Sequence, residues 1–169
     1  GRTYAAVDKI EDVARDRGFD MVSCGARFSG VSELEAFENV LSCHQQIAPR
    51  IDALYITVHR GVYISGLAKL LAPIYQHNIP TFSQSGSKEV KFGALFSIAQ
   101  AGFAKAALFH AEAIAKTFNG AKPRELDMIF ESPLKIAINL AVAQKIGYDP
   151  PIEVLGAADE IFLKIERKN

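Results

Sequence analysis

The sequence predicts an α/β fold, a three-layer sandwich in which a mainly parallel central sheet lies between helices. Short apolar runs without helical periodicity alternate along the chain with longer segments whose apolar residues recur every three or four positions. The run 53–57 is continuously apolar, which is typical of a strand covered on both faces. Strands and helices that alternate in this way form parallel sheets flanked by helices.

The first elements follow from local signals. An opening helix has an apolar face that includes Tyr4, Val7 and Ile10, and it ends near Gly18, a common helix stop. A strand is expected over 19–24. Ser32 and Glu35 form a capping box that starts a second helix, with Leu34 among its buried residues, and this helix stops before Pro49.

The remaining elements are expected over the ranges that follow. Strands are expected over 53–57, 79–82 and 95–99, and helices over 67–75 and 103–118. After Pro123 the pattern is less regular. Two strands over 126–130 and 134–139 precede a short helix, a Pro150-Pro151 break and a final short helix. We interpret residues 1–169 as a single α/β lobe.

Composition excludes several classes of function. The 169 residues suit one compact domain, and 22% of them are charged. Lys and Arg together number 19, as do Asp and Glu, so bulk charge does not favour nucleic acid or an anionic membrane. The apolar runs are well short of the roughly 18 residues of a membrane span. Cys24 and Cys43 lack metal-ligand spacing, and two buried free thiols are favoured over a disulfide.

Catalytic motifs are weak. The sequence has no G-x-G-x-x-G, Walker loop or H-E-x-x-H, and its histidines are scattered, with His44 and His110 inside expected helices. The stretch from Ser85 to Lys88 matches S-x-x-K but lacks the companion motifs of the enzymes that use it. We therefore expect no catalytic residue, no metal and no cofactor, and we interpret the protein as a non-enzyme.

Polar residues follow the expected strands where a ligand would bind. In an open parallel sheet, ligands lie beyond the carboxyl ends of the strands. The candidate ligand-binding residues at those positions are Thr57, His59, Arg60, Ser83, Gln84, Ser85 and Gln100. Such groups suit a small polar or zwitterionic molecule, and the Arg60 guanidinium could hold a carboxylate. Alternatively, the same residues are simple turn formers.

The chain also resembles the substrate-binding proteins of ABC transporters, a family that includes tryptophan-binding members. The resemblance rests on the segments 52–56, 79–82 and 93–95, on the turn 119–123, and on the closing pieces 138–140, 143–147 and 157–161. It covers almost the whole chain, and the order and spacing of the pieces fit.

The resemblance implies the type 1 periplasmic-binding-protein fold, in which two Rossmann-like lobes enclose a ligand. This chain matches the second half only, with the lobe's first strand missing before Gly1, and 123–169 would include hinge or crossover elements to an N-terminal lobe. Thr3 falls where the family often has a ligand-contacting Ser at a helix start, a position that suits a carboxylate.

The implied function is solute capture for an ABC importer, in the periplasm or outside the cell, with a lipid anchor as one means of attachment. The implied partners are a small-molecule solute, the transporter's membrane subunits and the N-terminal lobe, and isolated lobes are expected to pair with each other. Members that bind amino acids often have an Asp-Asn pair where this chain has His59-Arg60, and an Asp near the position of Ala101. Without these acidic groups, acidic, neutral or partly aromatic ligands are favoured. Phe103 is an aromatic residue near the cleft. A sensor module is the alternative, and an α/β enzyme a more distant one.

Overall fold

One five-stranded sheet organises the molecule. The computed structural model describes residues 2–100, 104–127, 129–131 and 134–167. The strands β1 (Leu54–Ile56), β2 (Thr81–Ser83), β3 (Phe96–Gln100), β4 (Leu134–Asn139) and β5 (Glu160–Phe162) lie in the order β1-β2-β3-β4-β5. All neighbours are parallel except β3 and β4, which are antiparallel. The prediction of a mainly parallel α/β sheet is confirmed.

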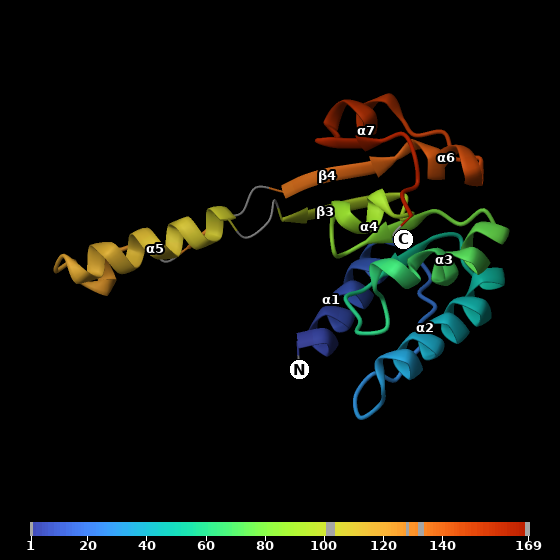
Figure 1. Cartoon of the computed structure of the whole chain (residues 1–169), viewed down its shortest axis with the longest axis horizontal. Helices are drawn as coiled ribbons and strands as arrows, with labels where there is room; N and C mark the ends of the chain where they lie inside the picture. Colours follow the sequence, from blue (N-terminus) through green and yellow to red (C-terminus); the bar gives the residue numbers. More distant parts are fainter. Residues whose placement is uncertain (1, 101–103, 128, 132–133, 168–169) are drawn as a thin grey trace.

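Helices cover both faces of this sheet (Figure 1). The described helices are α1 (Arg2–Arg17), α2 (Glu33–Ile47), α3 (Leu67–Gln76), α4 (Ser87–Lys91), α5 (Ala104–Phe118), α6 (Leu140–Ile146) and α7 (Ile152–Ala157), with 3-10 turns at 48–50, 64–66 and 123–125. One core joins α3 and α4 to β1, and α2 packs against α3 through Phe37 and Leu70. A second core joins α6 and α7 to Ile138 of β4.

Three local expectations need correction, and two short elements were missed. The segment 19–24 is not a strand; it is extended, with Val22 and Cys24 turned inward and their neighbours outward, but it pairs with no described strand. The described residues of 126–130 form no strand either. Leu34 is exposed in the first turn of α2, although it shares the helix face of Phe37 and Leu41. The short elements α4 and β5 were not expected, since five and three residues are too few to show a period.

A disulfide joins Cys24 to Cys43, so the expectation of free thiols is wrong. The extended segment runs alongside α2, where Asn39 Nδ2 donates to the Arg27 carbonyl at 2.9 Å. This path brings the two Cα atoms to 5.6 Å, within the range that a disulfide spans. Stable disulfides are typical of exported proteins.

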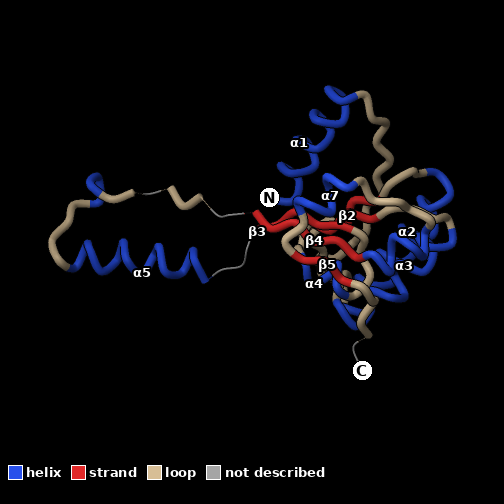
Figure 2. The backbone as a smooth tube through the Cα atoms, turned by 90° about the horizontal axis from the view of Figure 1, so that it is seen from above, coloured by secondary structure: helices blue, strands red, loops and turns tan. Residues whose placement is uncertain are grey.

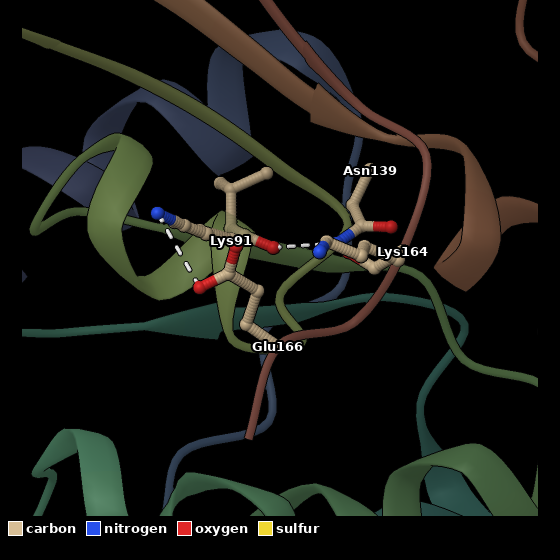
Figure 3. Close-up of polar contacts among 5 residues, drawn as sticks. Lys91, Asn139, Lys164 and Glu166 are labelled. Carbon is tan, nitrogen blue, oxygen red and sulfur yellow. Dashed lines mark hydrogen bonds and ion pairs between the residues drawn. The ribbon is translucent and has the colours of Figure 1, made fainter. Parts of the chain in front are cut away.

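Asn139 ties the C-terminal strands to α4. Its Oδ1 accepts from the N–H groups of Ala141 and Val142 and so caps α6, while its Nδ2 donates to the carbonyls of Val90 at 2.8 Å and Lys164 at 3.2 Å. Figure 3 shows this junction beside the Lys91–Glu166 ion pair at 3.3 Å. One buried amide therefore fixes three segments that are distant in sequence.

The helix α5 stands away from the rest of the molecule. Figures 1 and 2 show it in two perpendicular views, clear of the sheet and accompanied only by the residues that follow it. Phe109 of α5 lies 5.4 Å from Phe130, ring centre to ring centre. We call α5 and residues 119–131 the arm.

We expect protonation of His44 to weaken the fold. His44 is buried in α2, where its Nδ1 donates to the Leu70 carbonyl at 2.8 Å. Burial lowers the pKa of His44 below its usual 6.5, although the hydrogen bond to Leu70 opposes this shift. Well above pH 6.5 the side chain is neutral in both folded and unfolded chains. Below pH 6.5 His44 is protonated in the unfolded chain but stays neutral in the folded protein. The free energy of unfolding therefore falls by up to about 1.4 kcal/mol per pH unit.

Urea denaturation between about pH 7 and pH 5 measures this effect. His44→Asn keeps a donor near the Leu70 carbonyl and should flatten the pH dependence, whereas His110→Asn, on exposed α5, should leave it unchanged. Equal pH slopes for the parent protein and His44→Asn would contradict the assignment.

Candidate functional site

The carboxyl ends of β1 and β2 meet at one edge of the sheet. Ile56 pairs with Ser83, and Ser83 pairs with Ser97, so β1 and β2 end level with each other while β3 continues to Gln100. The loops that follow β1 and β2 therefore emerge side by side, next to the last residues of β3. This edge, formed by residues 57–61 and 84–86, is the candidate site.

Gln84 connects the two loops. Its backbone N–H donates to the Ile56 carbonyl at 3.0 Å, and its Oε1 accepts from the Val58 N–H at 3.2 Å. The side-chain amide nitrogen is left for another acceptor, and the residue is exposed. Gly86, two residues after Gln84, has φ +101 and lies against Ala99 of β3. A Cβ added to Gly86 would be 3.2 Å from the Ala99 Cβ. The three strand ends are thus held together.

Beneath the edge lies a buried polar cluster of Ser83, Glu89 and Ser97. The Ser83 hydroxyl donates to Glu89 Oε2 at 2.5 Å and accepts from the Ser85 N–H at 3.1 Å. Ser97, the register partner of Ser83, has a fully buried hydroxyl without a hydrogen-bond partner among the described residues. Sequence reasoning missed Glu89 and Ser97, because a glutamate in a polar stretch and a serine inside an apolar strand give no signal of burial.

His59 and Arg60 have structural contacts of their own. His59 Nδ1 accepts from the Gly61 N–H at 2.9 Å, so its Nε2 carries the proton and donates to the Ala26 carbonyl at 3.1 Å. Both ring nitrogens are therefore engaged in holding the loop after β1 to the extended segment. Arg60 is exposed, and its Nη1 donates to the Val31 carbonyl at 3.4 Å. Of the two, Arg60 has more hydrogen-bonding capacity left for a ligand.

The structure brings together most of the predicted site residues. Thr57, Gln84 and Ser85 share the edge, with Thr57 half-buried and the other two exposed, while Ser83 lies just below them. Gln100 ends β3, and Thr3 lies in the first turn of α1. Ala101 and Phe103 fall outside the described residues.

The chemistry of the edge is that of hydrogen bonding. Hydroxyl, amide and guanidinium groups can orient a small polar molecule without reacting with it. Lys88 and Ser87 lie in α4 while Ser85 lies in the loop before it, so the S-x-x-K serine does not sit on the helix that carries the lysine. In the described part of the chain, no three His, Cys, Asp or Glu side chains are arranged to hold a metal.

A cavity of about 450 Å³ lies in the arm and not at this edge. Its lining consists of Phe109, Asp127, Ile129, Phe130 and Glu131. It is open to solvent and is enclosed only by α5 and the residues after it, so it offers a ligand little burial compared with a cleft between two lobes. We do not place the candidate site there.

Three solved structures share this fold. A conserved domain protein from Vibrio cholerae is similar over 94% of this chain and 50% of its own, with 21% identity and a TM-score of 0.73. An ABC domain from Streptococcus pneumonia, in complex with L-Trp, is 19% identical over 95% of this chain and 52% of its own, with a TM-score of 0.67.

The third structure is a substrate-binding protein with adhesive properties from Clostridium difficile, in a ligand-free, open form. It is 19% identical over 96% of this chain and 51% of its own, with a TM-score of 0.71. No protein-family model matches the sequence, and no curated protein matches it significantly.

These comparisons define the fold. The chain has the α/β fold of one lobe of a substrate-binding protein, and it spans about half the length of each similar structure. Among the described residues, no helix combines the length and apolar character needed to cross a membrane.

Proposed function

We propose that this chain is one lobe of the extracytoplasmic solute-binding component of an ABC importer. A small molecule binds at the edge formed by residues 57–61 and 84–86, and a second lobe closes over it. The observation that carries the proposal is the match between almost the whole chain and half of each of two binding proteins, one of them holding L-Trp. The polar edge lies where a parallel sheet of this kind binds ligands.

The geometry of the edge supports binding without catalysis. Gln84 holds the loops after β1 and β2 in a fixed relation, so Thr57, Ser85 and the free amide of Gln84 face a ligand from a preorganised platform. Arg60 extends the platform with a guanidinium that suits a carboxylate. His59 and Ser83 support the platform from behind, through Ala26 and Glu89.

Ligand class follows from which charges are present. The loop after β1 has His59 and Arg60 where similar binding proteins often have an Asp-Asn pair. The nearby Glu89 is buried and hydrogen-bonded to Ser83. Within residues 57–61 and 84–86, Arg60 carries the exposed charge, and it is cationic. Solutes with a carboxylate or an uncharged aromatic group are favoured, and a free ammonium group would have to be held by the second lobe.

The remaining parts of the proposal concern context. Residues 123–169, which contribute β4 and β5 to the same sheet, also provide the hinge or crossover to the second lobe. Capture takes place outside the cytoplasm, in agreement with the disulfide between Cys24 and Cys43. The closed, liganded form is the one that the importer's membrane subunits recognise, because ligand shifts the population towards closure.

A thermal-shift screen tests the proposal. The protein is melted with L-tryptophan, other amino acids, small carboxylates, aromatic acids and purines. A bound solute at about 100 times its Kd should add about 2.7 kcal/mol and raise Tm by about 5–10 °C. Thr57→Val removes a hydroxyl at the edge and should abolish the shift.

Thr117→Val is the matched control, because it removes the same hydroxyl from α5, outside the edge. The control should keep the full shift. If a solute raises the Tm of Thr57→Val and of Gln84→Ala as much as it raises the Tm of the parent protein, that solute binds elsewhere. If no solute of any class raises Tm, the proposed binding function is wrong for this chain.

A further inference from the structure

Glu89 makes hydrogen bonds at both ends of the loop 84–86. Its Oε2 accepts from the hydroxyl of Ser83, the last residue of β2, at 2.5 Å. Its backbone N–H donates to the Gly86 carbonyl at 3.2 Å. The Ser83 Oγ in turn accepts from the Ser85 N–H at 3.1 Å. One residue of α4 therefore holds the loop from beneath, and it acts on Ser85 through the Ser83 hydroxyl.

The Ser83 hydroxyl depends on Glu89 for its position. A serine side chain has three staggered rotamers, and a buried hydroxyl adopts the one that brings it to an acceptor. Ser83 is fully buried, and Glu89 is the acceptor that its hydroxyl has among the described residues. Without Glu89, nothing in that part of the chain would keep the Ser83 Oγ under the Ser85 N–H, so Ser85 would lose its anchor.

The burial of Glu89 does not by itself favour the folded state. Glu89 is 6% exposed, and in the described part of the chain no Lys, Arg or His side chain forms an ion pair with it. Burying a carboxyl group without a cation is costly, and an apolar residue of similar volume is often tolerated equally well or better. We therefore look for the role of Glu89 in the loop that it holds.

We propose that Glu89 is a positioning residue of the solute site, which fixes Ser85 and the loop 84–86 without touching the solute. This inference rests on the proposed function, because the loop 84–86 is one of the two segments that form the edge. The loop after β1 cannot replace Glu89, since it is joined to the loop 84–86 through Gln84 and not through Ser85.

Glu89→Leu and Glu89→Gln form a matched pair of variants. Both keep a side chain of similar bulk, but Leu has no acceptor for the Ser83 hydroxyl, whereas Gln keeps one. In the solute-free protein, amide hydrogen exchange at Ser85, followed by NMR, should be about tenfold faster in Glu89→Leu, which is the effect of losing one hydrogen bond. In Glu89→Gln it should be no more than about threefold faster. Glu89→Leu should nevertheless keep or raise the Tm of the parent protein.

Two further variants test the route from Glu89 to Ser85. Ser83→Ala removes the hydroxyl between them, so it should speed the exchange of Ser85 as much as Glu89→Leu, and the double variant should add nothing. Thr81→Val is the control, because it removes an equally buried hydroxyl of β2 that accepts from the Leu95 N–H and not from the loop. It should lower Tm and leave the exchange of Ser85 unchanged.

Titration calorimetry with L-tryptophan and with benzoate measures the effect on solute binding. For a probe that binds the parent protein, Kd should rise about tenfold in Glu89→Leu and no more than about threefold in Glu89→Gln. Unchanged exchange of Ser85 in Glu89→Leu, an equal effect in Thr81→Val, or an unchanged Kd overturns the proposal. If neither probe binds the parent protein, the fault lies with the expected solute class, and the exchange of Ser85 still decides whether Glu89 holds the loop.

Discussion

Replacing Asn139 by alanine is expected to cost about 3–4 kcal/mol of stability and to lower Tm by about 10 °C. The substitution removes the cap of α6, worth about 1 kcal/mol. It also removes the amide donors to the carbonyls of Lys164 and of Val90, which keeps the Gly93 N–H, and each lost hydrogen bond costs about 1–1.5 kcal/mol. Chemical denaturation and calorimetry measure the loss.

Two further variants make this prediction specific. Asn119→Ala makes the same chemical change at an exposed position just after α5, and it should change stability by less than about 0.5 kcal/mol. Asn139→Asp keeps the oxygen that caps α6 but loses both amide donors, so its effect isolates the links to α4 and the C-terminal segment. If Asn139→Ala were as mild as Asn119→Ala, this junction would not hold the fold together.

Loss of the Cys24–Cys43 disulfide is expected to cost about 3 kcal/mol, the chain-entropy value for a loop of about this length. The bridge spans 19 positions in the sequence and holds an extended segment that pairs with no described strand. Reductant should therefore lower Tm by about 6–12 °C, and Cys24→Ser should do the same. The Ala26 carbonyl would also loosen, which frees His59.

The double variant Cys24→Ser, Cys43→Ser is the control for reductant itself, and its Tm should not respond to reductant at all. A thiol assay confirms that the bridge is open in the reduced parent. If the fully reduced parent melted at the same temperature as the oxidised protein, the bridge would carry no stability and the segment 19–28 would be held by its packing alone.

Much of the fold was predictable because its signals are local. Strands β1, β2, β3 and β4 lie within or one residue beyond the expected ranges, and α2 begins after the Ser32 cap and ends before Pro49 as expected. The Gly18 stop is also confirmed, with φ +72 after α1. The expected strand over 19–24 was wrong because the lack of a helical period shows only that a segment is not a helix, and not that a partner strand lies beside it.

The candidate site was predictable only in outline. Polar residues after strands suggested an edge, and the register of β1 with β2 does place Thr57, Gln84 and Ser85 together. Which of these side chains make structural hydrogen bonds and which are left for a ligand was not predictable. His59 shares its loop with Thr57, yet both of its nitrogens are engaged, and Ser83 faces Glu89 and not solvent.

By itself, the sequence determined the α/β class, most helix and strand positions, and the set of polar groups at the strand ends, because periodicity, caps and turn residues act over a few neighbours. Only the tertiary structure decided the Cys24–Cys43 pairing, the burial of Glu89 and Ser97, and the four bonds of Asn139. It also decided that α5 leaves its own sheet. These features depend on which distant segments come into contact, and no short stretch of sequence encodes that.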